Sequence, residues 1–429
     1  MSARVIQLGI IPYMRMFGNG TGILGGAVVL SVTLSAQTFT SLYNFGSRSY
    51  DGTSPGPGIL LGPHGELYGT TVNGGPRNFG TVYELLPPAS PGGAWTEVVL
   101  HSFNGNDGEG PSVGLLMGPG GAVYGVTPWS LGGYGTAFEL DPPTGGSTHW
   151  REAVIYRFTS ANVSSPSSAL EFGSGGSLYG TAGTKSGFGG AIYSLTPPAE
   201  AGGAWTETTL YSFTSGSAGS VPLGPLAVGS NGTLFGVTTY GGKEESPCNY
   251  RGCGTVFSLT PPAVSGEPWT EQLLYGFNPQ IGDGYSPYAG VVLAAGVLYG
   301  TTSSGGGRRR GAVFSLTPPT VPGAPMTETI LHVFNGSDGI TANSPLALGP
   351  NGVLYGTTIY GGANDRGTVF ELAPPASPGG RWTETILHSF NGTDGYNPMG
   401  IALGPDGTLY GTTLSGGTSN QGTVFALKP

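Results

Sequence analysis

Short apolar runs separated by glycine-rich turns recur along the chain, and their pattern is that of β-strands. A run of the form LYGTT occupies residues 67–71 and returns in related form around Tyr124, Tyr179, Phe235, Tyr299, Tyr355 and Tyr410. Each copy continues into a Gly-Gly turn, a GTVFEL-like run and a WTETILHSF-like run. The branched and aromatic side chains of these runs suit a pleated sheet, and amphipathic stretches of helical length are absent after the first few dozen residues. The pattern predicts an all-β fold.

The copies are evenly spaced, which makes internal repetition the strongest signal in the sequence. The intervals are 56, 55, 56, 64, 56 and 55 residues. A unit of this length with four strand-like runs is typical of a propeller blade. In the sixth unit we assign strand a to residues 345–349, b to 354–358, c to 367–372 and d to 382–390. We predict a seven-bladed β-propeller of four-stranded blades over residues 37–429.

The two ends of the repeat array are complementary. Residues 37–45 (QTFTSLYNF) align with strand d and follow no strand a, b or c, whereas residues 422–429 (GTVFALKP) provide a strand c with no strand d after it. We therefore predict that residues 37–45 pair beside the last strand c and close the ring, which removes the open sheet edges that promote aggregation. A linear solenoid is the alternative, and it would need capping repeats at both ends.

The first 36 residues differ from the repeats. Arg15 precedes an apolar stretch at residues 23–34 that is short for a membrane span, and Ser35-Ala36 offers a small-residue cleavage point. We predict a signal peptide over residues 1–36 and no membrane span in the remaining chain. An uncleaved anchor is the alternative. The expected location is secreted or extracellular, with the periplasm and the cell surface left open.

Composition and charge narrow the class of protein. Glycine and proline account for 82 and 36 of the 429 residues, and because they fall at recurring turn positions such as residues 349–352, they indicate turns rather than disorder. Acidic residues number 24 and basic residues 15. Nucleic-acid binding needs a basic surface that displaces counterions from phosphates, so the sequence predicts no nucleic-acid partner.

Taken together, the repeated motifs resemble a known family. The set of LYGTT, a Gly-Gly turn, a GTVFELTPP-like run and WTETILHSFNG resembles the GloVer tandem repeat of the choice-of-anchor tandem repeat GloVer-containing proteins, from Gln37 to Pro429. The order of its parts is also similar to kelch repeats. The first resemblance implies an exported protein, often held at a bacterial cell surface by a C-terminal sorting segment, and no settled activity. The chain ends at Lys428-Pro429 without a hydrophobic tail, which leaves release and surface retention open.

Residues that recur at one position of the repeat are interpreted as parts of the blades. His101, His332 and His388 share a strand d position that holds tyrosine in other copies, so packing is the favoured interpretation. A glutamate that recurs two residues after a tryptophan column is likewise architectural. The tryptophans are expected to wedge between blades, with glycan stacking as the alternative. The Asp-Gly pairs after strand d predict self-capped turns, with calcium coordination as the alternative. No metal site and no cofactor is predicted.

The b–c loops vary while the strands do not, and they carry the candidate binding residues. In a four-stranded blade these loops and the d–a connections lie on one rim of the ring, where propellers commonly present ligand sites. Of the 15 basic residues, Arg4 and Arg15 precede residue 37, and eight of the remaining 13 lie in b–c loops. A cationic rim predicts an anionic partner, whereas a solvated loop face is the alternative. The candidate binding residues are Arg77, Trp129, Lys185, Tyr240, Arg251, Arg308, Arg309, Arg310 and Arg366.

The longest b–c loop contains the two cysteines of the chain, Cys248 and Cys253. In an exported protein this close spacing predicts a local disulfide. Because the closed segment is short, such a bond is expected to pin the loop rather than the fold.

These observations favour an exported, monomeric, non-enzymatic propeller that binds or scaffolds an anionic polysaccharide or protein through its b–c loops. The alternative is a polysaccharide-active enzyme, a lyase or hydrolase, with a site at the mouth of the central channel. An enzyme would need ionisable groups from one or two blades to converge. No pair of acidic or basic residues in the sequence has a spacing that indicates a catalytic acid and base. A passive structural spacer is a third option.

Overall fold

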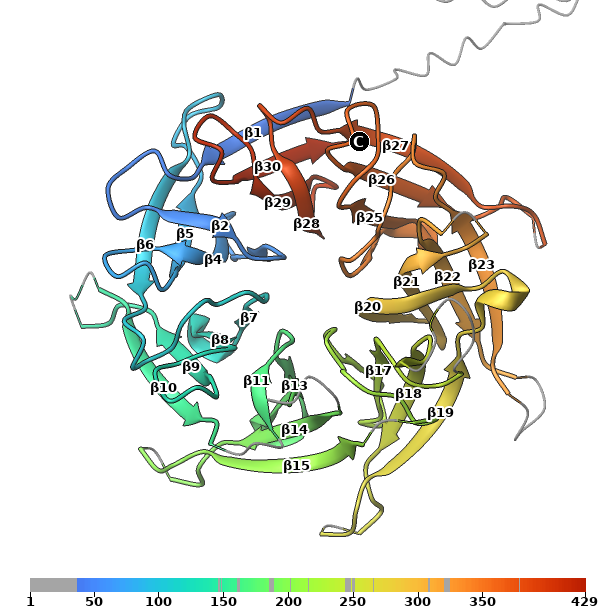
Figure 1. The fold of residues 1–429 in the computed structure, drawn as a ribbon. Coiled ribbons are helices and arrows are strands. Elements are labelled where there is room, and N and C mark those ends of the chain that lie inside the picture. The colour runs from blue at the N-terminus through green and yellow to red at the C-terminus, as the bar shows by residue number, and fades with distance from the viewer. Residues whose placement is uncertain are drawn as a thin grey trace, which may run out of the picture. The chain divides into compact units, whose positions relative to one another are not determined.

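The fold is a ring of seven antiparallel β-sheets, the blades, as the repeat predicts (Figure 1). The computed structural model describes residues 37–429 except for residues 146, 148, 160–162, 185–188, 201, 215, 244–247, 249–250, 265, 308, 320–324 and 378. Within each sheet the strands follow one another from the centre of the ring to its outside. The prediction of a seven-bladed propeller is confirmed.

The first four blades each come from one continuous stretch of chain. Blade 1 contains β2 (Gly52–Pro55), β3 (Leu60–Leu61), β4 (Leu67–Gly74), β5 (Thr81–Leu86) and β6 (Thr96–Ser102). Blade 2 contains β7 (Leu116–Met117), β8 (Val123–Thr127), β9 (Thr136–Asp141) and β10 (Arg151–Arg157). Blade 3 contains β11 (Ser164–Pro166), β12 (Glu171–Phe172), β13 (Leu178–Gly183), β14 (Gly190–Thr196) and β15 (Thr206–Phe213). Blade 4 contains β16 (Ala227–Val228), β17 (Leu234–Thr238), β18 (Thr255–Thr260) and β19 (Thr270–Gly276).

The remaining blades include the one that joins both ends of the array. Blade 5 contains β20 (Gly284–Ala294), β21 (Val297–Gly305), β22 (Ala312–Thr317) and β23 (Thr327–Val333). Blade 6 contains β24 (Ala347–Leu348), β25 (Leu354–Thr358), β26 (Thr368–Ala373) and β27 (Thr383–Ser389). Blade 7 contains β28 (Tyr396–Leu403), β29 (Leu409–Ser415), β30 (Thr423–Lys428) and β1 (Thr38–Asn44). Short 3₁₀ turns lie at η1 (Pro119–Gly121), η2 (Ser174–Gly176), η4 (Pro279–Ile281) and η5 (Pro350–Gly352).

The ring closes where the first strand pairs with the last. β1 runs antiparallel to β30, from Thr38 opposite Lys428 to Asn44 opposite Thr423, and Figure 1 shows the two strands side by side. The backbone N–H of Phe45 extends the pairing by donating to the carbonyl of Gly422 at 3.0 Å. The predicted closure is therefore present, and it leaves neither end of the array with an open edge.

Aromatic side chains fill the interfaces between blades. The phenylalanine at the C-terminal end of each strand d is fully or almost fully buried, and it meets an aromatic ring of strand c in the next blade edge-on, at centroid distances of 5.0–5.3 Å. Such pairs add about 0.5–1.5 kcal/mol to the burial of their area. The pairs are Phe45–Tyr83, Phe103–Phe138, Phe158–Tyr193, Phe213–Phe257, Phe277–Phe314, Phe334–Phe370 and Phe390–Phe425.

The tryptophan column also packs between blades, as expected. Trp150 meets Tyr68 of the preceding blade edge-on at a centroid distance of 6.0 Å, and Trp269 meets Tyr179 at 5.8 Å. Trp205 and Trp382 make equivalent contacts with Tyr124 and Tyr299. The tyrosines belong to the LYGTT runs, so the two most conspicuous motifs of the repeat are partners in space.

Every outer strand contains a bulge that the sequence alone does not reveal. In each pairing of strand c with strand d the register skips one residue, immediately before the His/Tyr position. A bulge changes the face on which the following residues lie. Each skipped side chain joins a different one of the seven hydrophobic clusters between blades. The skipped residues are Leu42, Leu100, Ile155, Leu210, Leu274, Leu331 and Leu387.

Removing the closing strand should destabilise the whole ring. A chain that starts at residue 46 lacks β1 and the ring of Phe45, so blade 7 loses its outer strand and blade 1 loses a packing partner. Compared with a chain that starts at residue 37, we expect its melting temperature to fall by more than about 10 °C in thermal unfolding followed by circular dichroism.

If the shortened chain does not fold, the substitution Phe45→Ala provides the same test in the longer chain. A fully buried phenylalanine replaced by alanine costs about 3–5 kcal/mol. An unchanged melting temperature in both variants would refute closure by this strand.

Candidate functional site

The b–c loops lie against the d–a connections and form one rim of the propeller with them. Isolated β-bridges join the two kinds of segment between Glu109 and Trp129, between Ser220 and Tyr240, and between Ile340 and Tyr360. We call this surface the b–c rim. It brings together the loops that the sequence singled out for their variability.

A strained backbone position fixes each b–c loop to the next blade. Where each blade begins, one residue has a positive φ, and its N–H donates to a carbonyl at the end of the preceding b–c loop at 2.7–3.2 Å. Only one of these residues is glycine, although non-glycine residues adopt this conformation at an energetic cost. The rim is therefore built on a rigid frame. The residues are Ser54, Gly110, Ser165, Val221, Ser286, Thr341 and Asn397, with φ of 52–63°.

Two candidate arginines of the rim are held by aromatic rings. The guanidinium carbon of Arg366 lies 4.6 Å from the ring centroid of Tyr396, and that of Arg251 lies 5.4 Å from the ring of Tyr240. Arg251 Nη1 also donates to the Tyr240 hydroxyl at 3.4 Å. Stacking on a ring orders a long side chain and so lowers the entropy lost when it binds a ligand.

The other candidate cations are distributed around the rim. Arg310 Nη1 donates to the carbonyl of Asn335 at 2.7 Å, and the carbonyl of Arg310 accepts the N–H of Thr341 at 2.9 Å. Arg77, on the loop of blade 1, and Arg309 are exposed. Blades 4, 5 and 6 thus carry most of the described candidates, whereas Arg77 stands apart. Lys185 and Arg308 lie outside the described residues.

A central cavity of about 660 Å³ is lined by residues from all seven blades. Of the candidate residues, Trp129 lies on its wall with half of its surface exposed, and its ring packs against Gly110, where a Cβ would come within 3.0 Å of the ring. Much of the lining is apolar, with Tyr288 as a second aromatic residue. Among the described lining residues Glu171, on β12, is the one carboxyl group, and burial raises its pKa to about 7.

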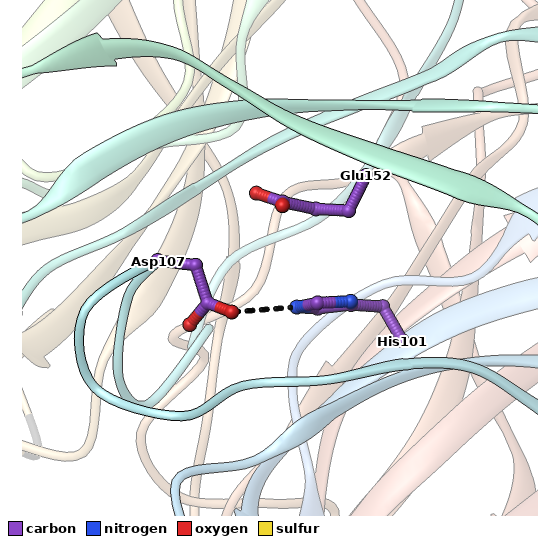
Figure 2. Close-up of side chains that lie close together, drawn as sticks. All are labelled: His101, Asp107 and Glu152. Atoms are coloured by element: carbon purple, nitrogen blue, oxygen red, sulfur yellow. Dashed lines mark hydrogen bonds and ion pairs between the residues drawn. The ribbon is translucent and has the colours of Figure 1, made fainter.

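The recurring His, Asp and Glu residues occupy separate positions of the repeat, but the fold brings them together between blades. His101 Nε2 donates to Asp107 Oδ2 at 3.2 Å, and Glu152 of the next outer strand faces the pair (Figure 2). The same three residue types meet at His332, Asp338 and Glu384. The bulge and the path of the d–a connection create this meeting. The only signal in the sequence is that the three columns recur together.

The aspartates also cap their own turns, as predicted. Asp107 Oδ1 accepts the N–H of Asn104 at 2.8 Å, and Asp338 Oδ1 accepts that of Asn335 at the same distance. Burial opposes ionisation of Asp107, but the hydrogen bonds from His101 and Asn104 prevail and lower its pKa. These carboxylates are therefore charged groups enclosed between two blades.

Other interfaces carry variants of the same cluster. Tyr43 donates to Asp51 at 3.1 Å beside Glu97, and Tyr275 donates to Asp283 at 2.6 Å beside Glu328. The buried Oε1 atoms of both glutamates lack a hydrogen-bond partner among the described residues. Burial, followed by the charge of the neighbouring aspartate, raises the pKa of Glu97 and of Glu328 to about 7.

The interface between blades 6 and 7 departs from this pattern. Phe39 of β1 takes the place of the glutamate, and its ring stacks on His388 with a centroid distance of 3.9 Å and an interplanar angle of 9°. His388 still donates to Asp394 at 3.0 Å. The strand that completes blade 7 thus covers an imidazole with an apolar ring where other interfaces place a carboxyl group.

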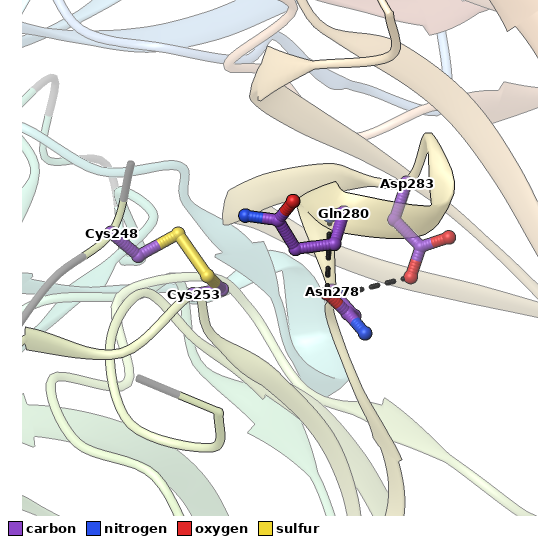
Figure 3. The surroundings of a disulfide bond; sticks show 5 residues. All are labelled: Cys248, Cys253, Asn278, Gln280 and Asp283. Atoms are coloured by element: carbon purple, nitrogen blue, oxygen red, sulfur yellow. Dashed lines mark hydrogen bonds between the residues drawn. A yellow bond between two sulfur atoms is a disulfide. The ribbon is translucent and has the colours of Figure 1, made fainter. Parts of the chain in front are cut away.

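The structure contains the disulfide between Cys248 and Cys253, whose Cα atoms are 5.1 Å apart (Figure 3). It lies in the b–c loop of blade 4, near the turn formed by Asn278 and η4 in the connection to blade 5. Cys253 is fully buried, and its carbonyl accepts the N–H of Ser286 in the next blade at 2.8 Å. The disulfide therefore joins a variable loop to a fixed point of the frame.

In the described part of the chain, no helix is long and apolar enough to cross a membrane.

The fold and these sites define a seven-bladed β-propeller whose variable loops border a central cavity. The chain belongs to the Gloeobacter/Verrucomicrobia repeat family, whose model matches residues 14–250 and 245–429. This membership agrees with the resemblance in the repeated motifs. Comparison with curated protein sequences gives no match.

Solved structures with similar folds have diverse functions. The extracellular domains 1–2 of Drosophila semaphorin 1a have a TM-score of 0.51 and 11% identity, with 91% of this chain and 88% of that chain covered. Polysaccharide lyase Uly1 has a TM-score of 0.49 and 13% identity, with 90% and 93% covered. A putative oxidoreductase (glucose dehydrogenase) from Thermus thermophilus has a TM-score of 0.43 and 16% identity, with 91% and 99% covered. At these identities the likeness concerns the fold alone.

The raised pKa of Glu97 predicts a dependence of stability on pH. A carboxyl group whose pKa is 4.5 when unfolded and about 7 when folded favours the folded state fully below pH 4.5. This contribution is lost as the pH rises through about 7. Glu97→Gln cannot ionise, so at pH 8 we expect it to be more stable than the unsubstituted protein by on the order of 1 kcal/mol in urea unfolding, with the advantage gone near pH 4.5.

The exposed Glu200 provides a control, because Glu200→Gln removes the same charge from a solvated site. We expect it to leave the pH profile unchanged. Equal stability of the Glu97→Gln variant and the unsubstituted protein at pH 8 would show that Glu97 ionises in the interface without an energetic penalty.

Proposed function

We propose that the protein is an exported, non-enzymatic propeller that binds an acidic polysaccharide through its b–c rim. The observation that carries the proposal is the arc of ordered arginine and tyrosine side chains on blades 4–7. Arg251 stacks on Tyr240, Arg366 stacks on Tyr396, and Arg310 is bonded to the adjacent connection. Arginine recognises carboxylates, and aromatic rings suit the flat faces of sugars.

An anionic polysaccharide fits this arc better than a compact ligand. The cations belong to successive blades, so a ligand must extend along the rim to reach several of them. Tyr360 is 40% exposed and its ring centroid lies 6.4 Å from that of Tyr396, which gives blade 6 and the start of blade 7 adjoining aromatic surfaces. The frame of strained residues holds the loop ends in place, which reduces the ordering cost of binding. An acidic protein surface is the alternative partner.

A second candidate function, a polysaccharide hydrolase or lyase, is favoured by one observation. Glu171 places a carboxyl group of raised pKa in the central cavity, as a general acid would require. Hydrolysis of glycosides generally uses a pair of carboxyl groups flanking the bond. The described lining of the cavity supplies one, so binding is the better-supported function.

The arginines of the rim should be needed for binding. We expect the triple variant Arg309→Ser, Arg310→Ser and Arg366→Ser to lower the affinity for polygalacturonate at least tenfold in isothermal titration, because each lost arginine removes charged hydrogen bonds to carboxylates. The affinity of the unsubstituted protein should also fall as salt increases. A neutral glucan should not bind measurably.

The opposite rim supplies a control with the same change of charge. Arg151, Arg381 and Lys428 lie at the ends of strands or loops on the c–d side. Replacing these three with serine should leave the affinity unchanged. If both triple variants lost the same affinity, the effect would come from the net charge of the protein, and a site on the b–c rim would be contradicted. Release of new reducing ends or unsaturated products during incubation would favour the enzyme instead.

A further inference from the structure

Two interfaces between blades carry a set of side chains that can hold a metal ion. His101 Nε2 and the carboxylates of Asp107 and Glu152 all offer an atom within 4.8 Å of the others (Figure 2). His332, Asp338 and Glu384 repeat this arrangement between blades 5 and 6. In both sets the histidine is on the outer strand of one blade, the aspartate is in the connection, and the glutamate is on the outer strand of the next blade.

One carboxylate oxygen of each glutamate in these clusters has no hydrogen-bond donor among the described residues. These atoms, Glu152 Oε1 and Glu384 Oε1, are both buried. A buried carboxylate oxygen without a partner costs free energy, and a bound cation removes this cost. The aspartates beside them are more than nine-tenths buried, so each cluster concentrates negative charge away from solvent. Clusters of exposed acidic residues lack both properties.

We propose that each of these two clusters binds one Zn²⁺ ion. A ligand set of one imidazole nitrogen and two carboxylates suits zinc, which takes nitrogen and oxygen ligands in a four-coordinate site with water in the remaining position. Ca²⁺ prefers six to eight oxygen ligands, which these clusters do not supply. The ion takes the position of the proton on the histidine Nε2, and the imidazole binds as its neutral tautomer, with its one ring proton on Nδ1.

The other interfaces provide natural comparisons within the same chain. Tyr43 and Tyr275 occupy the histidine position beside an aspartate and a glutamate, so these clusters lack the nitrogen ligand. At His388 and Asp394 the nitrogen and one carboxylate are present, but Phe39 replaces the glutamate. The chain thus shows that the fold accepts Tyr for His and Phe for Glu, and the full set of three occurs together at two described interfaces.

Zinc at these positions would cross-link neighbouring blades. Each ion would connect the outer strands of two adjacent blades with the d–a connection that runs from the first blade to the second. Since it binds the folded state and finds no preformed site in the unfolded chain, it would raise stability with zinc concentration. Neither cluster includes a residue that lines the central cavity, and each meets the b–c rim through its aspartate, which lies in a d–a connection.

The test measures zinc bound to the full chain, produced without a histidine tag. After incubation with excess zinc sulfate and removal of free metal, elemental analysis should find two zinc ions per chain, one for each cluster. In the double variant His101→Tyr, His332→Tyr we expect none. Tyrosine is the residue that the chain itself uses at this position, so the variant should fold, which circular dichroism checks. Zinc should raise the melting temperature of the unsubstituted protein and not that of the variant.

Two further variants make the assignment specific. His388→Tyr changes the same column in the cluster that lacks a glutamate, and it should leave both ions bound. Phe39→Glu completes that cluster and should add a third ion. Absence of stoichiometric zinc in the unsubstituted protein, or retention of the same zinc content in the double variant, would overturn the proposal.

Discussion

The antiparallel pairing of β1 with β30 is the constraint on which the rest of the structure depends. A blade is apolar on both faces, so it is stable only between two neighbours, and the array has no natural end until the ring closes. The closure joins residues that are far apart in sequence: Asn44 Oδ1 accepts the N–H of Thr418 at 3.0 Å, and Thr412 Oγ1 donates to the carbonyl of Gly56 at 2.9 Å. The first contact ties β1 to the rest of blade 7, and the second fixes blade 7 against blade 1. Together they convert a linear repeat into one cooperative body.

Closure also explains how loops that differ between blades are held by backbone hydrogen bonds that recur in every blade. The N–H that anchors each b–c loop comes from the next blade, so a loop end is fixed only when that blade is in place. The positive φ at the start of each blade costs energy, which packing in the closed ring offsets. Among the described residues, the hydrogen bonds of this frame involve the ends of the loops, and the loop with Cys248 and Cys253 is the longest of the seven in sequence.

The interfaces between blades combine apolar packing with enclosed charge. The aromatic pairs lie beside polar clusters in which an aspartate caps a turn and a glutamate from the next blade approaches it. Such clusters cost desolvation energy, and the raised pKa of Glu97 expresses that cost. At the interface between blades 6 and 7 this cost is absent, because the ring of Phe39 takes the place of the carboxyl group. The same position of the repeat therefore holds a carboxyl group at most interfaces and an aromatic ring at this one.

The sequence by itself determined the blade, the number of blades and the closing strand, because each follows from local pattern and from counting copies. It also separated repeated residues from variable loops and placed the two cysteines in one loop. It could not show the bulge before His101, the positive φ of Thr341, or the meeting of His101 with Asp107 and Glu152, since each depends on how one blade lies against the next. Trp129 was a rim residue in the sequence, and only the fold placed it on the wall of the central cavity. Periodicity is a property of one unit and can be read along the chain, whereas a site between units is fixed only by the packing of the closed ring.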